Sequence, residues 1–344
     1  MSIEELVKSV EYLGSVDKSI DFSLHNNIAI CSDENALYGL GVLAFSILKN
    51  IKSKCIIHIF FNGSLQESDK KRLERLTSLF DAFIVIYYMN NECFENLYTV
   101  RNITTTAYYR LVVPYILDFY NISKVLYLDT DMLVLSDISD LFTRSVTVVY
   151  VVKNSTSKPL EWEYYRSSIG MLHDSYFNSG MMLINVVAYK EYDIGQRAIK
   201  LLKQRDFKYM DQDVLNILLE NLAEVDLSVR YNCTMSVVNN QYMAERRVDI
   251  VHFTGNKKPW KLFTEFWGDY DSNNEVEKYS WKYKYYKLWR IYAEASPWND
   301  VELEWPKDYH EWRYLSKAQI KNKQFIKGVI SYYKYLKNKK SNNC

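Results

Sequence analysis

The stretch that decides the fold is Lys124-Val125-Leu126-Tyr127-Leu128-Asp129-Thr130-Asp131-Met132-Leu133-Val134. Its first apolar run is too short for a helix and is typical of a buried strand. Asp129 and Asp131 then fall where that strand leaves the core, on the same side of an extended backbone, so both carboxylates can reach one hard divalent cation. Open α/β sheets bind ligands beyond the carboxyl ends of their strands, which makes this edge a candidate site for a metal-bound diphosphate. Taken alone, an Asp-x-Asp is more often a solvated turn.

The composition indicates a globular protein with a large core. Of its 344 residues 48% are hydrophobic and 15% aromatic, and the net charge of +1 argues against a general attraction to nucleic acid. No apolar run approaches the length of a membrane span, and the acidic N-terminus lacks the apolar region of a signal peptide. The five cysteines form no CxxC pair, which predicts reduced thiols in a cytosolic protein and no zinc site: Cys31, Cys55, Cys93, Cys233 and Cys344.

Strands and helices alternate after a polar lead over residues 1–26. Short apolar runs predict the first three strands at Ile28–Cys31, Cys55–Phe61 and Phe83–Tyr88. Ser32-Asp33-Glu34-Asn35 is typical of a turn and N-cap before the first helix. A later strand, Val146–Val152, precedes a polar and aromatic insertion over residues 154–174. The alternation predicts an α/β fold with a mostly parallel sheet between helices, and no GxGxxG follows the first strand to suggest a dinucleotide site.

Four polar positions outside the central strand each allow a plain and a functional interpretation. Arg110 ends an expected capped helix over Thr104–Leu111, where a surface arginine is the plain interpretation. Asn178 follows a strand-leading turn and either offers its amide to a ligand or satisfies its own backbone as an Asx turn. Asp211 stands in the first turn of a helix, where acids are favoured without a ligand. His252 ends a strand, where a lone histidine is more often a core residue than a ligand.

The last part of the chain is aromatic and basic. An aromatic stripe at helical spacing runs through Trp281, Tyr285, Leu288, Trp289 and Tyr292. From Lys317 to Cys344 there are eight lysines and no acidic residue, and one helical face carries Phe325, Val329, Tyr332 and Leu336. Such a basic amphipathic helix either lies in an anionic membrane interface or packs its aromatic stripe on the domain and exposes its lysines to water.

Several motifs in one order resemble family 8 retaining glycosyltransferases. They run from about Ile28 to Trp260: Ser32–Asn35, the Thr-rich segment ending in Arg110, Leu126–Asp131, Phe177–Gly180, Asp211–Asp213 and His252–Gly255 with Lys258–Trp260. Within that family the chain is most similar to enzymes that add glucose or galactose to the outer core of bacterial lipopolysaccharide, which share Ser296-Pro297-Trp298 and a Tyr/Lys-rich tail, here Gly328–Lys340. The resemblance implies a GT-A nucleotide-sugar-binding fold over residues 27–265 and a helical C-terminal region over 266–344, with a basic tail at 317–344.

The resemblance also implies a site. Asp129, Asp131 and His252 are then ligands of Mn²⁺, with Mg²⁺ as a substitute, and the metal bridges the diphosphate of a UDP-hexose. Further donor contacts fall to Asp33 and Asn35 on uridine, to Gly255 and Lys258 around the phosphates, and to Arg110, Asn178, Asp211 and Gln212 on the hexose. Thr130 is also expected to bind the nucleotide sugar. Gln212 is placed nearest the anomeric carbon, with Asp211 as its catalytic partner. An amide is a poor nucleophile, which favours a front-face path over double displacement.

The implied enzyme is a cytoplasmic α-1,2 or α-1,3 hexosyltransferase, peripheral on the inner face of the cytoplasmic membrane, with a lipopolysaccharide core as acceptor. Three alternatives stay open. The 30 tyrosines suggest a self-glucosylating enzyme of the glycogenin type, although packing explains most of them. An Asp-x-Asp after a strand also begins phosphatases of the haloacid dehalogenase type, which would give no role to His252. A non-enzymatic sugar-binding module would need a broken metal site. The donor sugar, the linkage, the accepting core sugar and the oligomeric state are left open.

Overall fold

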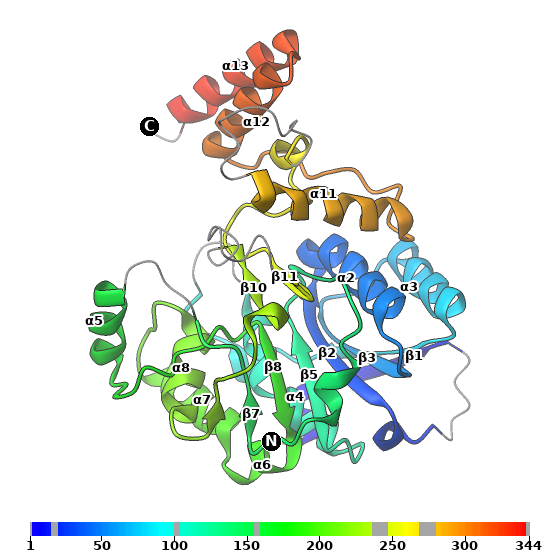
Figure 1. The fold of residues 1–344 in the computed structure, drawn as a ribbon, viewed down its shortest axis with the longest axis vertical. Coiled ribbons are helices and arrows are strands. Elements are labelled where there is room, and N and C mark those ends of the chain that lie inside the picture. Colours follow the sequence, from blue (N-terminus) through cyan, green and yellow to red (C-terminus); the bar gives the residue numbers. More distant parts are fainter. Residues whose placement is uncertain are drawn as a thin grey trace.

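The central feature of the computed structural model, which describes residues 2–14, 20–99, 104–154, 159–235, 247–267 and 280–341, is an eight-stranded sheet. Its strand order is β1-β4-β3-β2-β5-β8-β7-β9 (Figure 1). Four neighbours run parallel: β4 (Phe83–Met89), β3 (Cys55–Asn62), β2 (Asn26–Asp33) and β5 (Lys124–Leu128). The flanking strands are β1 (Val7–Leu13), β8 (Met181–Asn185), β7 (Val149–Tyr150) and β9 (Ala223–Glu224). The predicted α/β fold is confirmed.

Helices cover both faces of this sheet. One face packs against α2 (Leu37–Asn50) and α3 (Glu67–Phe80). The other packs against α4 (Val113–Asp118), α6 (Val186–Glu191), α7 (Ile194–Gln204) and α8 (Met210–Leu219). Along β5, Leu126 and Leu128 join the first core while Val125 and Tyr127 join the second. Burial on both faces is the reason why the central strands are continuous apolar runs.

A second, three-stranded sheet begins where β5 ends. Its order is β10 (Cys233–Thr234), β11 (Ile250–His252) and β6 (Met132–Val134). The connection Asp129–Asp131 therefore passes from one sheet to the other. Strands β6 and β11 pair antiparallel with Met132 opposite His252, and this register brings the histidine beside the aspartate pair.

The structure corrects several expected elements. The first strand is β1, preceded by α1 (Ile3–Leu6), so the lead over residues 1–26 contributes an edge strand to the sheet. The strand expected at Val146–Val152 is only Val149–Tyr150, and the insertion after it contains α5 (Pro159–Ile169). The capped helix expected over Thr104–Leu111 is a 3₁₀ helix, Thr105–Leu111, and the Thr104 hydroxyl donates to Asp33 (2.7 Å) instead of capping it.

The predicted thiols are confirmed as free for four cysteines: Cys31, Cys55, Cys93 and Cys233. Cys344 lies outside the described residues, as do the side chain of Trp281 and residues 155–158 of the insertion. In the described part of the chain, no helix has the length and apolar character needed to cross a membrane.

The C-terminal helices fall into two groups (Figure 1). Helix α11 (Ser280–Ala295) packs on α2, and its Trp289 and Tyr286 are buried in a cluster with Trp260 and Val42. Helices α12 (Tyr309–Lys321) and α13 (Phe325–Ser341) form a hairpin that projects from the body beyond α11.

Candidate active site

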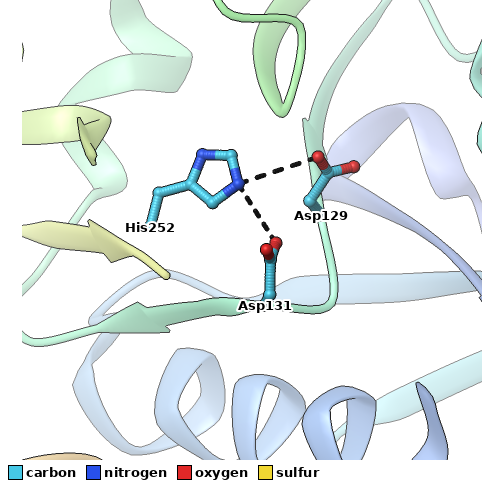
Figure 2. A group of neighbouring side chains, drawn as sticks. All are labelled: Asp129, Asp131 and His252. Carbon is cyan, nitrogen blue, oxygen red and sulfur yellow. Dashed lines mark ion pairs between the residues drawn. The ribbon is translucent and has the colours of Figure 1, made fainter. Parts of the chain in front are cut away.

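Asp129, Asp131 and His252 converge at the junction of the two sheets, as the sequence predicted. Nε2 of His252 lies 3.1 Å from Oδ1 of Asp131 and 3.9 Å from Oδ2 of Asp129 (Figure 2). One ligand atom from each residue lies within 4.8 Å of the others. Backbone bonds fix the arrangement: Phe253 N–H donates to the Asp131 carbonyl (2.8 Å), and Asp129 N–H donates to the Gly180 carbonyl (2.8 Å).

Each of the two carboxylates has one oxygen occupied by a fixed cationic partner. Oδ1 of Asp129 accepts from the Tyr127 hydroxyl (2.8 Å) and pairs with Nη2 of Arg110 (2.9 Å). Oδ2 of Asp131 pairs with the ammonium group of Lys258. The oxygens that remain, Oδ2 of Asp129 and Oδ1 of Asp131, are the ones that face His252.

This donor set fits a divalent metal ion. Burial raises the pKa of Asp131, but Lys258 and then His252 outweigh it and hold that pKa well below its usual range, so the carboxylate is anionic. Two carboxylate oxygens and one imidazole suit a borderline cation such as Mn²⁺ better than zinc, which favours more nitrogen and sulfur. The structure therefore brings the three candidate ligands together, with the Asp131 carboxylate in the anionic form that binds a cation.

Gly180 makes this close approach feasible. A Cβ at this position would lie 2.6 Å from Oδ2 of Asp129 and would overlap the His252 ring. Any larger residue would displace a candidate metal ligand, which explains why the turn before β8 consists of small residues.

Arg110 is buried and bridges two carboxylates, so the plain interpretation as a surface arginine is wrong. Its Nη2 pairs with Asp129, and its Nε lies 3.0 Å from Oδ2 of Asp211. Its Nη1 donates to the carbonyl (2.9 Å) and hydroxyl (3.0 Å) oxygens of Ser179. Two anions around one cation are stable at this depth because the guanidinium presents several donors in a fixed plane.

Asp211 is also buried, and it is paired with Arg110. Burial raises the pKa of its carboxyl to about 6, although Arg110 acts in the opposite direction. Because Arg110 Nε–H donates to the Ala107 carbonyl (3.0 Å), Oδ2 of Asp211 accepts no hydrogen bond from any described residue. The ion pair with Arg110 is therefore the main stabilising contact of this buried oxygen in the described part of the chain.

Gln212 is held by three hydrogen bonds. Its Oε1 accepts from Nδ2 of Asn178 (3.0 Å) and from the backbone N–H of Ser179 (3.2 Å), while its Nε2 donates to the Tyr176 hydroxyl (3.0 Å). Oδ1 of Asn178 accepts from Gly180 N–H (3.1 Å). Asn178 therefore forms the Asx turn and also orients Gln212, while its contact with a ligand stays a prediction.

The other predicted donor-binding residues lie around this centre. Asp33 and Asn35 form a separate group at the end of β2, where the Asp33 carboxylate accepts from Asn35 N–H (2.9 Å). Lys258 also donates to the Phe253 carbonyl (2.9 Å). Thr130 packs against α2: its carbonyl oxygen lies 2.8 Å from the position that a Cβ on Gly39 would occupy. Gly255 has φ +84°, and the space where its Cβ would be is open. The left-handed φ requires glycine at position 255.

Sequence reasoning missed four residues that position the site. They are Tyr127, Tyr176, Ser179 and Asn232, which contact Asp129, Gln212, Arg110 and His252 respectively. A polar tip within an apolar run was the available signal for Tyr127. Asn232 carried a weaker signal, as a single amide beside a two-residue strand.

A mixed sheet with an aspartate pair at its edge is the architecture expected of a GT-A glycosyltransferase, and comparison with known proteins identifies the class. The chain belongs to glycosyl transferase family 8, whose family model matches residues 27–263. The model of the family 8 C-terminal region matches residues 283–339. Membership in this family confirms the predicted resemblance and removes the phosphatase alternative.

Two curated relatives match over nearly the whole chain. A lipopolysaccharide 1,3-galactosyltransferase of Salmonella typhimurium is 29% identical over 330 residues, 91% of each chain. The lipopolysaccharide glucosyltransferase WaaO of Escherichia coli is 28% identical over 349 residues, 95% of this chain and 96% of the relative. The solved structure of galactosyltransferase LgtC in complex with donor and acceptor sugar analogs has a TM-score of 0.63 at 22% identity and covers 78% of this chain and 96% of its own. This structural likeness confirms the GT-A fold.

Proposed function

We propose that this chain is a metal-dependent, retaining hexosyltransferase that moves glucose or galactose from a UDP-sugar to a hexose of the lipopolysaccharide outer core. The observation that carries the proposal is the convergence of Asp129, Asp131 and His252 beside the buried Arg110–Asp211 pair. The first group suits a cation with a diphosphate, and the second suits a sugar. The lipopolysaccharide acceptor rests on the names of the two full-length relatives.

Each residue has a role that follows from its contacts. A bound Mn²⁺ or Mg²⁺ would neutralise the charge that develops on the departing UDP. Lys258 and the Gly255 backbone lie on the loop after His252, where they can hold the phosphates, and Asp33 and Asn35 are assigned to uridine. Arg110 and Asn178 fix the positions of Asp211 and Gln212, whose side chains are assigned to the hexose. Oδ2 of Asp211, which is paired with Arg110, is assigned to a sugar hydroxyl.

The hydrogen bonds of Gln212 favour a front-face path. Its Oε1 already accepts two donors, so this oxygen is an even poorer nucleophile than an ordinary amide. In the front-face path the bond from the anomeric carbon to the UDP oxygen breaks while a bond to the acceptor oxygen forms on the same face. The acceptor hydroxyl gives its proton to the departing phosphate. A hexosyl adduct trapped on any side chain would contradict this path.

Helix α13 supports a peripheral position on the inner face of the cytoplasmic membrane. The face that packs on α12 combines small or polar residues with the ring of Tyr335, which lies beside Tyr309. Ser316 Oγ donates to the Gly328 carbonyl (2.8 Å), and Ser331 Oγ donates to Oε1 of Gln319 (2.7 Å). The large apolar side chains point outward instead and are exposed: Phe325, Ile326, Val329, Ile330, Tyr332, Tyr333 and Leu336. An apolar face flanked by lysines suits an anionic lipid surface.

The test is UDP release from UDP-glucose and from UDP-galactose with Mn²⁺, with and without truncated lipopolysaccharide cores. Release with one donor that the acceptor stimulates would establish the transferase and identify its sugar. The matched variants are Asp131→Asn, which removes a candidate metal ligand, and Asp137→Asn, an aspartate remote from the site that bonds Ser139 (2.6 and 3.0 Å). Only the first should abolish release. A hexose-sized mass increase on the purified protein would favour the glycogenin-type alternative, and no release with either donor would contradict the proposal.

A further inference from the structure

A continuous chain of hydrogen bonds joins the candidate metal ligand His252 to Gln212, and Asn232 is its central link. Nδ1 of His252 lies 3.0 Å from Oδ1 of Asn232, and Nδ2 of Asn232 donates to Oδ1 of Asn178 (3.1 Å). Asn178 then donates to Gln212 (3.0 Å). Asn232 is buried, at 2% exposure, directly before β10.

The direction of every bond in this chain follows from two backbone donors. An amide side chain can be turned by 180° without changing its shape, so the bonds around it must decide its orientation. Gly180 N–H can only donate, so the atom of Asn178 that it meets at 3.1 Å is oxygen. Ser179 N–H can likewise only donate, so the atom of Gln212 that it meets at 3.2 Å is oxygen. Nδ2 of Asn178 is therefore the group that faces Gln212.

The same reasoning extends to the imidazole. Because Oδ1 of Asn178 accepts, Asn232 must turn its Nδ2 toward Asn178 and its Oδ1 toward His252. An oxygen at 3.0 Å from Nδ1 requires a proton on Nδ1. In a neutral imidazole the other nitrogen then carries a lone pair. That nitrogen is Nε2, which faces Asp129 and Asp131, whereas Nδ1 points away from both carboxylates (Figure 2).

The other end of the chain is also fixed. Nε2 of Gln212 donates to the Tyr176 hydroxyl (3.0 Å), which in turn donates to Oδ1 of Asp213 (2.6 Å). Asp213 is fully buried and also accepts from the Tyr165 hydroxyl (2.5 Å) and from Tyr209 N–H (2.8 Å). This series of hydrogen bonds thus ends on the Asp213 carboxylate, whose orientation is fixed by three hydrogen bonds.

We propose that Asn232 is a positioning residue, which holds His252 in the Nδ1–H tautomer so that Nε2 stays bare toward the cation, and which ties the metal ligand to the orientation of Gln212. Asn232 touches neither the cation nor the sugar. The inference rests on the proposed function for the role of the metal, but the tautomer of His252 is a property of the metal-free chain. Groups that orient metal ligands in this way typically change metal affinity by about 10- to 100-fold when removed.

The experiment compares the full-length chain with two variants that separate the two bonds of Asn232. Asn232→Ala removes both the acceptor for His252 and the donor to Asn178. Asn232→Asp keeps an acceptor for Nδ1–H but places an oxygen against Oδ1 of Asn178. The matched control is Asn27→Ala. Asn27 is also a buried asparagine, and its Oδ1 lies 2.9 Å from the buried His58. Asn27 belongs to the start of β2, whereas the candidate site lies beyond the opposite end of the sheet strands.

The first measurement is the ¹⁵N spectrum of histidine in the metal-free protein, which reports whether Nδ1 of His252 carries a proton. The chain has five histidines, and His252→Asn assigns the signal. We expect a protonated Nδ1 that donates to position 232 in the wild type and in Asn232→Asp, and an unchanged Nδ1 proton in Asn27→Ala. Asn232→Ala should show a mixture of tautomers. An unchanged tautomer in Asn232→Ala would overturn the proposal.

The second measurement is affinity for Mn²⁺ alone, by titration of the metal-free chain. Asn232→Ala should bind about 10- to 100-fold more weakly, whereas Asn232→Asp and Asn27→Ala should bind no more weakly than the wild type. Asn232→Asp should nevertheless lose UDP release at saturating Mn²⁺, since Gln212 is no longer oriented. Full activity of Asn232→Asp, or wild-type affinity in Asn232→Ala, would overturn the proposal. Absence of Mn²⁺ binding in the wild type would count against the proposed function, while the tautomer would still decide for or against Asn232.

Discussion

Gly180 shows how little space the candidate metal site leaves. A Cβ at this position would overlap the His252 ring and would lie 2.6 Å from Oδ2 of Asp129, so only a glycine hydrogen fits there. The backbone bond from Asp129 N–H to the Gly180 carbonyl (2.8 Å) prevents the strand from moving away. Gly180→Ala should therefore displace one candidate ligand and weaken Mn²⁺ binding by at least about tenfold, measured by titration of the metal-free protein.

The control for this substitution is another glycine without room for a side chain. A Cβ on Gly41 in α2 would overlap the indole of the buried Trp298, remote from the candidate ligands. Overpacking of this kind typically costs about 1–3 kcal/mol of stability. Gly41→Ala should thus lower the melting temperature but leave Mn²⁺ affinity unchanged. Equal loss of affinity in both variants would mean that the effect at Gly180 is general destabilisation.

The metal ligands could be predicted from the sequence, but their supporting residues could not. Asp129, Asp131 and His252 each follow or end an apolar run, and strand ends meet at sheet edges, so their convergence follows from the pattern. The burial of Arg110 could not be inferred, because a short helix with one arginine has the same pattern at the surface. The role of Asn232 depends on which loop packs beside β11, and that packing is set by contacts far apart in the sequence.

His58 joins the three central parallel strands through polar contacts inside the core. From β3 its Nε2 contacts Oδ1 of Asn27 on β2 (2.9 Å), and its Nδ1 contacts the Tyr87 hydroxyl on β4 (3.0 Å). Complete burial lowers the pKa of His58 from 6.5 to about 3. The folded state therefore keeps this imidazole neutral at pH values where the unfolded chain protonates it. Acidification from about pH 6.5 to 3 should then destabilise the fold by about 1.4 kcal/mol per pH unit at this residue alone.

A variant without a titrating side chain isolates this contribution. His58→Gln should be less stable than the wild type at pH 8, because it loses ring packing and a contact. The stability difference should shrink as the pH falls from 6.5, since only the wild type pays for keeping a histidine neutral. Urea denaturation of both proteins at several pH values measures this difference. A difference that stays constant with pH would mean that folded His58 accepts a proton as readily as unfolded His58.

Elements with two buried faces were predictable, and edge elements were not. Strands β2, β3 and β4 have mostly apolar central residues because helices cover both faces. Among the described residues β1 pairs with β4 alone, at the edge of the sheet. Its Lys8, Ser9 and Glu11 give it the polar character of a sheet edge, so its sequence is typical of a loop. Helix α5 was missed for a similar reason, because apolar and polar residues alternate without a clear face in the insertion.

Helix α13 should bind anionic membranes through its outward face. Ile326 and Tyr333 are 80% and 68% exposed, so replacing both with serine removes apolar area without disturbing the fold. Each buried apolar side chain is worth about 1.5–3 kcal/mol, so the double variant should bind vesicles at least about tenfold more weakly. Co-sedimentation with phosphatidylglycerol vesicles measures this binding. The control is Leu172→Ser, which alters a side chain that is 87% exposed at a remote surface. Equal binding of all three proteins would contradict a membrane role for α13.

The division of the chain into a catalytic domain and a C-terminal region at residue 265 stays a prediction. Helix α11 lies after this boundary but packs against strands that lie before it. Trp289 and Tyr286 of α11 lie in one buried cluster with Leu133, Val251 and Phe253. Leu133 belongs to β6, and the other two residues flank His252. The C-terminal region thus packs against the small sheet that contains His252 and whose strand β6 directly follows Asp131.

Two shortened chains would show whether this packing is needed. A chain ending at residue 265 lacks Tyr286, Trp289 and Trp298, whose rings bury on the order of 500 Å² and contribute about 12 kcal/mol, comparable with the whole stability of a typical domain. It should not unfold cooperatively or bind Mn²⁺. A chain ending at residue 306 keeps these rings and the pair between Lys261 and Glu304 (2.8 Å), so it should fold and bind Mn²⁺ while losing the α12–α13 hairpin. Cooperative unfolding and full Mn²⁺ affinity in the chain that ends at residue 265 would mean that the first 265 residues are an autonomous domain. Helix α11 would then not be needed to support the metal site.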